Sequence, residues 1–197
     1  MIKPRQKMLS RICVVALFSA LICILSPLAI PIGPIPISLS LVAVLLSAML
    51  LGVWGSLSAV AVYLMLGAMG LPVFSGGMAG LGVLLGPTGG YIWSYLPICL
   101  LCGWLYRTLF FSRPNKERGF FKLFWGIVCG LPGLLLCYLL GTLQYMLVAS
   151  ISFWSALAVC VIPFVGFDLL KLALVAFLGE KMLRIRWIRR MLGDCFG

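Results

Sequence analysis

Residues 38–52 read Ser38-Leu-Ser-Leu-Val-Ala-Val-Leu-Leu-Ser-Ala-Met-Leu-Leu-Gly52, and no charged side chain interrupts them. The uncharged sequence extends outward in both directions, from Ile12 to Tyr106. The whole chain of 197 residues is 63% hydrophobic and only 10% charged, so it has too few polar side chains to cover the surface of a water-soluble globule. The sequence therefore predicts an all-α membrane protein that crosses the bilayer several times.

Glycine and proline divide this apolar sequence into candidate spans. A membrane-spanning helix needs about 20 predominantly apolar residues, and clusters of Gly and Pro mark the places where a helix is expected to end. The pattern predicts six transmembrane helices within one integral membrane domain, residues 1–197. The expected spans cover residues 10–29, 38–52, 55–71, 88–106, 120–150 and 163–183.

Lysine and arginine gather in three clusters, within residues 3–11, 107–122 and 181–190. The net charge is +11, and each cluster flanks an apolar span, where cytoplasmic loops of membrane proteins collect basic residues. This placement accounts for the charge without a nucleic-acid partner. Four spans separate the first two clusters and two spans separate the last two, so the three clusters and both termini are expected on the cytoplasmic side.

The chain lacks the residues that several kinds of catalysis and metal binding require. The chain contains no histidine, which is the commonest general base and metal ligand. Asp168 is the only acidic residue expected at membrane depth, so no pair of carboxylates is available for acid–base catalysis or for holding magnesium. No GxxxxGK[ST] phosphate-binding sequence occurs, so ATP hydrolysis requires another chain. We therefore expect no enzymatic activity, no metal site and no cofactor.

Asp168 and Lys171 are the two charged residues that fall inside an apolar stretch. Three residues apart, they lie on one face of a helix. A charge at the centre of a bilayer costs about 3 kcal/mol, so an ion pair within a span points to a function. Asp168 could accept N–H donors, and Lys171 could offer a cation to a carbonyl or carboxylate. A structural salt bridge that locks this helix to its neighbours is the alternative.

The sequence from Gly70 to Tyr91 contains eight glycines and two prolines. A stretch so rich in glycine does not form a stable spanning helix, and irregular backbone at membrane depth is tolerated where it lines a cavity. Phe74 and Tyr91 could supply apolar walls for a ligand, whereas a plain connecting loop is the alternative. The proline-rich loop at residues 30–38 could act as a lid or be a simple outer turn.

Four elements of the sequence resemble those of a known family. They are Pro31-Ile-Gly-Pro-Ile-Pro-Ile37, Gly70-Leu-Pro-Val-Phe74, Leu85-Gly-Pro-Thr-Gly-Gly-Tyr91 and Pro163-Phe-Val-Gly-Phe-Asp-Leu-Leu-Lys171. In their order and spacing they resemble the BioY family, the membrane-embedded biotin-binding (S) components of energy-coupling factor (ECF) transporters. The resemblance runs through nearly the whole chain.

The resemblance implies a six-helix protein of the bacterial cytoplasmic membrane that captures biotin from outside. It also implies partners, which are a transmembrane coupling (T) protein and two cytoplasmic ATPases. The residues expected at the biotin site, from the resemblance and the glycine-rich pattern together, are Asp168, Lys171, Phe74, Gly76, Gly77, Gly89, Gly90 and Tyr91. Those expected in a lid loop over the site are Pro34, Ile35 and Pro36.

Ala16 and Ala20 match the small-residue face that such components pack against the coupling protein. Small residues four apart permit two helices to approach closely. The same property serves ordinary packing within the chain, so both interpretations stay open.

The chain departs from the family pattern at three places. Ser38-Leu-Ser40 stands where the family often has threonine or serine followed by Leu-Gln, Gly166-Phe-Asp168 replaces Pro-Gly-Asp, and Gln144 replaces a tryptophan. These changes bear on the details of the pocket more than on the class of substrate. An S component for another small vitamin and a non-transporting structural subunit stay open as alternatives. The residues do not decide which end of biotin Lys171 contacts.

Overall fold

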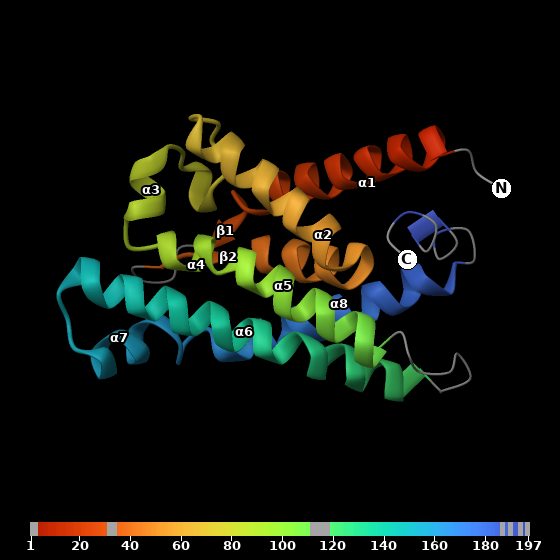
Figure 1. The fold of residues 1–197 in the computed structure, drawn as a ribbon. Coiled ribbons are helices and arrows are strands. Elements are labelled where there is room, and N and C mark those ends of the chain that lie inside the picture. The colour runs from red at the N-terminus through yellow and green to blue at the C-terminus, as the bar shows by residue number, and fades with distance from the viewer. Residues whose placement is uncertain are drawn as a thin grey trace.

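The computed structural model describes residues 4–30, 35–110 and 119–185, together with residues 188, 191, 192 and 195. These residues form an elongated helical bundle (Figure 1). The α-helices are α1 (Pro4–Leu25), α2 (Ser40–Ala68), α3 (Leu81–Leu85), α4 (Gly89–Trp93), α5 (Tyr95–Leu105), α6 (Gly119–Ala149), α7 (Phe153–Cys160) and α8 (Val165–Arg184). A 3-10 turn, η1 (Ser75–Gly77), and a π-helical turn, η2 (Tyr106–Phe110), complete the helical elements. The prediction of a predominantly helical chain is confirmed.

Two short strands were not predicted. Strands β1 (Ala29–Ile30) and β2 (Ile37–Ser38) pair antiparallel, with Ala29 opposite Ser38 and Ile30 opposite Ile37. The β-branched isoleucines suit extended backbone, and prolines in the intervening sequence cannot continue a helix. The hairpin brings the end of α1 beside the start of α2.

The chain reverses direction within α2, at Gly52. This glycine has φ +66° and ψ −163°, a backbone conformation that is essentially restricted to glycine. In a straight helix Ser40 and Tyr63 would lie about 35 Å apart. Instead, the hydroxyl of Ser40 lies 2.5 Å from that of Tyr95, and the ring of Tyr63 lies 6.3 Å from the same tyrosine ring. Residues 40–51 and 53–68 are therefore two antiparallel arms, which agrees with the predicted division into 38–52 and 55–71.

The first arm of α2, residues 40–51, occupies the centre of the bundle. Every one of its residues is buried, as expected for a helix that is apolar on all sides. Neighbouring helices approach it where they carry glycine. A Cβ atom at Gly133 of α6 would lie 3.2 Å from Leu45, and one at Gly179 of α8 would lie 2.3 Å from the sulfur of Met49.

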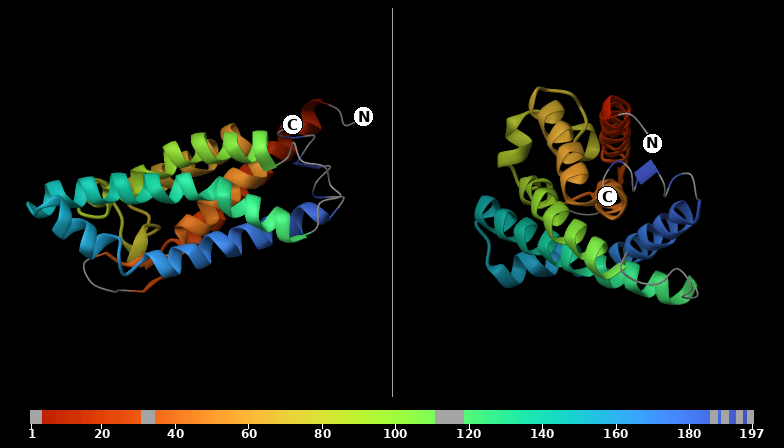
Figure 2. Two further views of the ribbon diagram at one scale, coloured as in Figure 1. Left: turned by 90° about the horizontal axis from the view of Figure 1, so that it is seen from below. Right: turned by 45° about the vertical axis from the view of Figure 1, so that its right-hand side comes forward.

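The two ends of the bundle differ in character (Figures 1 and 2). The start of α1, η2, the start of α6 and the end of α8 lie at one end, and these segments carry the described members of all three basic clusters. We call it the basic end. The opposite end holds the β-hairpin, α3, α4 and α7. The prediction that the three clusters share one side is consistent with this arrangement.

The outer surface of the bundle is apolar. Leu17, Trp54 and Leu170 are 66%, 79% and 69% exposed, which suits side chains that face lipid. Three described helices are long and apolar enough to cross a membrane, and α7 with α8, bent by 55°, forms a fourth candidate. That count treats the two antiparallel arms of α2 as one helix. The exact number of six crossings stays a prediction.

We expect Gly52→Ala to destabilise the protein, because an L-residue at this φ and ψ is strained by about 1–3 kcal/mol. The measurement is the midpoint of thermal unfolding in detergent, which should fall clearly below that of the parent. Gly82→Ala is the matched control, since a Cβ atom there meets nothing within 4 Å and its φ is not positive. An equal midpoint for Gly52→Ala and the parent would show that the reversal does not need a glycine.

Candidate functional site

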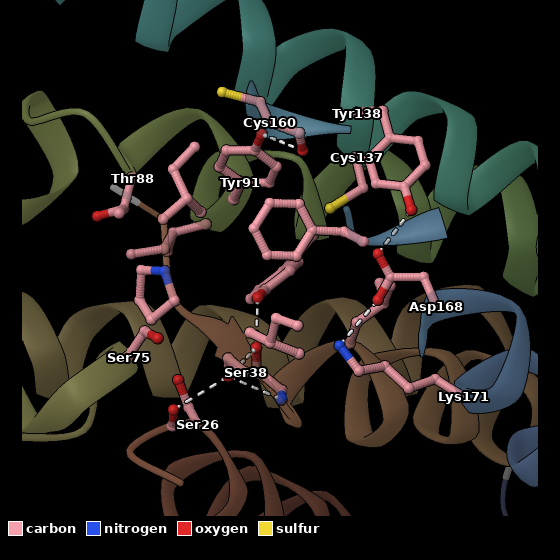
Figure 3. A pocket seen from close by; sticks show the side chains of 18 residues that line it. Ser26, Ser38, Ser75, Thr88, Tyr91, Cys137, Tyr138, Cys160, Asp168 and Lys171 are labelled. Atoms are coloured by element: carbon pink, nitrogen blue, oxygen red, sulfur yellow. Dashed lines mark hydrogen bonds and ion pairs between the residues drawn. The ribbon is translucent and has the colours of Figure 1, made fainter. Parts of the chain in front are cut away.

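A cavity lies at the end of the bundle that holds the β-hairpin (Figure 3). Its walls come from the hairpin and the helices around it, and side chains of three kinds line it. The polar ones are Ser26, Ser38, Ser40, Ser75, Thr88, Asp168 and Lys171; the aromatic ones include Tyr91, Tyr95, Tyr138 and Phe164; Ile35, Pro36, Ile37, Leu41 and Ile92 are among the apolar ones. A mostly apolar pocket with a few convergent polar groups is the usual form of a small-molecule site.

Asp168 and Lys171 form a buried ion pair on the wall of this cavity. The ammonium of Lys171 donates to Oδ1 of Asp168 at 2.8 Å, and their exposed fractions are 8% and 6%. The hydroxyl of Tyr138, on α6, donates to Oδ2 at 2.6 Å. Asp168 also lies in the first turn of α8, where the helix dipole favours a negative charge. The predicted pairing on one helix face is confirmed, and both groups border open space.

Tyr138 is a site residue that the sequence reasoning missed. It lies 30 positions before Asp168, within an apolar helix in which a tyrosine is expected simply to pack against its neighbours. A buried tyrosine hydroxyl normally needs a partner, and that requirement was the available signal. With both of its oxygens engaged, the Asp168 carboxylate is held in one orientation.

A chain of hydroxyl groups forms a second polar wall of the cavity. Tyr63 pairs with Ser26 at 2.8 Å between oxygens, and Ser38 donates to the backbone carbonyl of Ser26 at 3.0 Å. Ser38 then meets the hydroxyl of Ser40 at 2.8 Å, and Ser40 that of Tyr95. The chain joins the turn after α1, β2, both arms of α2 and α5. The sequence marked Ser38 and Ser40 as a departure from the family pattern, without indicating this network.

Tyr91 enters the cavity from α4. Its hydroxyl donates to the carbonyl of Cys160 at 3.4 Å, and its ring lies against Gly141, where a Cβ atom would come within 2.3 Å of the ring. Of the residues predicted at the site or its lid, Tyr91, Asp168, Lys171, Ile35 and Pro36 line the cavity. Pro34 lies outside the described residues.

The other predicted site residues are not among those that line the cavity. Phe74 is fully buried, with its ring against Gly67 and 5.5 Å from the ring of Tyr63. Gly76 and Gly77 have positive φ in the turn next to Ser75, which does line the cavity. They lie in the structure around the cavity, and a direct role in binding stays a prediction.

Gly89 and Gly90 allow α4 to contact α6 directly. A Cβ atom at Gly90 would lie 2.3 Å from the carbonyl oxygen of Leu140, and one at Gly89 would lie 2.4 Å from the side-chain amide of Gln144. That amide donates to the carbonyls of Leu84 and Gly86 at 2.9 and 2.8 Å. Gln144, the substitution for the family's tryptophan, therefore fixes the segment between α3 and α4.

Ala16 and Ala20 are exposed on α1. Their exposure leaves this face open to lipid or a partner, and a docking role stays a prediction. Within the described residues, no group of three or more His, Cys, Asp or Glu side chains is arranged to hold a metal ion.

The fold and the cavity together define a class, a helical membrane protein with a small, mostly apolar cavity at one end of its bundle. The model of the BioY family matches residues 3–187. The chain belongs to the BioY family.

Similar proteins support this membership. The chain is 36% identical over 174 residues to the biotin transporter BioY of Thermotoga maritima, covering 86% of this chain and 93% of that protein. It is 35% identical over 171 residues to the biotin transporter BioY2 of Lactococcus lactis, covering 86% and 88%. A solved S-component for biotin from an ECF-type ABC transporter superposes with a TM-score of 0.81 at 26% identity, covering 93% of this chain and 95% of the other.

We expect Gly90→Ala to lower the free energy of unfolding by about 1–3 kcal/mol, the usual cost of overpacking. The added methyl group would meet the backbone of α6, which cannot move aside as a flexible side chain does. Thermal unfolding in detergent measures the effect. Gly166→Ala, where a Cβ atom meets nothing within 4 Å, is the control and should match the parent. If both variants unfold alike, α4 does not depend on this contact.

Proposed function

We propose that this chain binds biotin in the cavity beside Asp168 and Lys171, and that it serves biotin uptake as the S component of an ECF-type ABC transporter. The observation that carries the proposal is the buried Asp168–Lys171 pair, hydrogen-bonded by Tyr138, which faces a mostly apolar cavity. Its context is a member of the BioY family whose relatives are named biotin transporters. The function is transport, and no catalytic step is assigned to it.

The chemistry of biotin suits these walls. Its ureido ring offers two N–H donors and a carbonyl, its thiophane ring and valeryl chain are apolar, and it ends in a carboxylate. Asp168 accepts hydrogen bonds, Lys171 provides a cation, and side chains such as Ile35 and Ile92 provide apolar contact. Lys171 can serve either the terminal carboxylate or the ureido carbonyl. Comparing biotin with its neutral amide on the parent and on Lys171→Met distinguishes the two.

The hairpin is the proposed lid. The enclosed cavity volume is about 70 Å³, below the range of about 300–1,000 Å³ for small-molecule pockets. A ligand the size of biotin therefore enters only if part of the wall moves outward. Strand β2 and the preceding Ile35 and Pro36 suit this movement, since two paired residues on each strand hold them.

Energy for uptake comes from other chains in this proposal. A transmembrane coupling protein and two cytoplasmic ATPases supply it, and the exposed Ala16 and Ala20 on α1 form the docking face. The chain lies in the bacterial cytoplasmic membrane, crosses it six times and places its basic end in the cytoplasm, in accord with the positive-inside rule.

A structural subunit of a membrane complex is the rival function. In that case the ion pair would only fasten α8 to α6 through Tyr138. An S component for a different vitamin is a second rival. Equilibrium binding of biotin to the purified protein separates all three, since a structural subunit binds no vitamin and another S component prefers its own.

We expect Asp168→Asn and Lys171→Met each to weaken biotin binding about ten- to a hundredfold, the effect of losing one charged hydrogen-bond partner, about 1.5–3 kcal/mol. Titration calorimetry in detergent measures the affinity, and gel filtration shows whether each variant stays monodisperse. Arg184→Met is the matched control, because Arg184 pairs with Glu180 on the same helix at 2.6 Å and does not line the cavity.

Two results would overturn this assignment. One is parental affinity in both variants. The other is loss of binding only through misfolding, with the charge-swapped double variant, Asp168→Lys and Lys171→Asp, recovering stability and binding together. Either result makes the ion pair purely architectural.

We expect Ala20→Leu, alone or with Ala16→Leu, to weaken association with the coupling protein by about tenfold or more, since overfilling a packed contact costs about 1–3 kcal/mol. Co-purification with the tagged coupling protein measures association, and biotin affinity should stay unchanged. Ala158→Leu, a matched change at an exposed alanine of α7, should leave association intact. Equal loss in the α1 and α7 variants would remove α1 as the docking face.

A further inference from the structure

The turn η1 carries a serine, Ser75, whose hydroxyl has no partner within the protein. Its oxygen is buried, and no group in the described part of the chain forms a hydrogen bond with it. Ser75 also lines the cavity beside Asp168 and Lys171. A buried hydroxyl without a partner costs free energy, so such a group in a native protein calls for an explanation.

The hydroxyl chain on another wall of the same cavity provides the contrast. Ser38 and Ser40 pair with each other at 2.8 Å between oxygens, and Ser40 also pairs with Tyr95. These hydroxyls therefore bond to one another within the protein. Ser75 has no such bond, and its capacity both to donate and to accept is available to a molecule in the cavity.

Ser75 lies on the opposite side of the cavity from Asp168 and Lys171 (Figure 3). The two charged residues belong to α8, whereas Ser75 belongs to the segment that joins α2 to α3. A ligand that the ion pair holds at one end can therefore present its other end to Ser75. Biotin carries an acceptor oxygen at each end, in the ureido carbonyl and in the carboxylate.

The backbone of the turn holds Ser75 in place. The N–H of Phe74 donates to the carbonyl of Met78, and the N–H of Gly77 donates to the carbonyl of Phe74, both at 3.0 Å. Gly76 and Gly77 have φ +71° and +76°, a conformation that residues with a side chain rarely adopt. Because the donor is already positioned, a hydrogen bond from it costs little ordering when a ligand binds.

We propose that Ser75 is a further ligand-binding residue, whose hydroxyl donates to an acceptor oxygen of biotin at the end that Asp168 and Lys171 do not hold. The inference rests on the proposed biotin function. The oxygen belongs to the carboxylate if Lys171 serves the ureido carbonyl, and to the ureido carbonyl if Lys171 serves the carboxylate. In both cases the ligand supplies the partner that the protein does not give to Ser75.

Titration calorimetry of the purified full chain in detergent tests the proposal. We expect Ser75→Ala to weaken biotin binding about three- to tenfold, the effect of losing one hydrogen bond from a neutral donor. Without ligand, its midpoint of thermal unfolding should equal or exceed that of the parent, because the substitution removes a buried hydroxyl that has no partner. A serine that only supports the fold would instead lower the midpoint.

Ser19→Ala is the matched control. Ser19 is 3% exposed and does not line the cavity, so this variant should keep the parental affinity for biotin. Two analogues identify the acceptor oxygen. They are the neutral amide of biotin and the imino analogue, in which an NH group replaces the ureido oxygen. The loss of affinity in Ser75→Ala should shrink for the analogue whose altered group faces Ser75, and for that one alone.

Three results would overturn the inference. Parental biotin affinity in Ser75→Ala would do so while leaving the proposed function intact, whereas a parent that binds no biotin would overturn both. An equal loss of affinity for biotin and both analogues would show that Ser75 shapes the wall without touching either oxygen. Should Ser75→Ala fail to stay monodisperse, Ser75→Cys, which puts a weaker donor in the same place, gives the same comparison.

Discussion

The constraint on which the rest of the structure depends is the burial of twelve consecutive residues in the first arm of α2. A helix that is apolar on all sides is buried on all sides. In this chain the segments before and after the arm fold back to cover it. Gly52 makes the reversal, and Gly103 of α5 lets α5 approach that turn, since a Cβ atom there would lie 2.9 Å from the backbone nitrogen of Val53. Gly133 and Gly179 give α6 and α8 the same close approach.

The polar groups that line the cavity gather around the start of this arm. At its start, Ser40 joins the hydroxyl chain, and Asp168 and Lys171 face the same cavity from α8. A buried ion pair gains little net stability, because desolvation offsets the attraction between the charges. Two protein hydrogen bonds to Asp168 reduce that cost. The remaining donor capacity of Lys171 borders the cavity, so the pair is suited to meet a ligand as well as to fasten α8.

Sequence reasoning succeeded where a single local property decides the structure. The long uncharged sequence predicted a membrane environment, and the basic clusters predicted which segments share one end of the bundle. The spacing of Asp168 and Lys171 predicted that they lie on one helix face. It fell short where the outcome depends on which helices face each other. The absence of a Cβ atom at Gly89 and Gly90 could serve contact with a ligand or with a helix, and only the positions of Leu140 and Gln144 on α6 show that a helix meets them. Tyr138 was missed for the same reason, because its hydrogen bond to Asp168 depends on α6 facing α8.

The cavity and the exposed face of α1 are connected through the hairpin. Strand β1 continues the chain from α1 after a short turn, and β2 pairs with it while Ser38 donates to the carbonyl of Ser26, at the end of α1. Ile35, Pro36 and Ile37, just before this point, line the cavity. An outward movement of β2 would therefore break contacts with the segment that directly follows the helix carrying Ala16 and Ala20. These contacts, made by two paired strands and one serine, join the cavity wall to that segment.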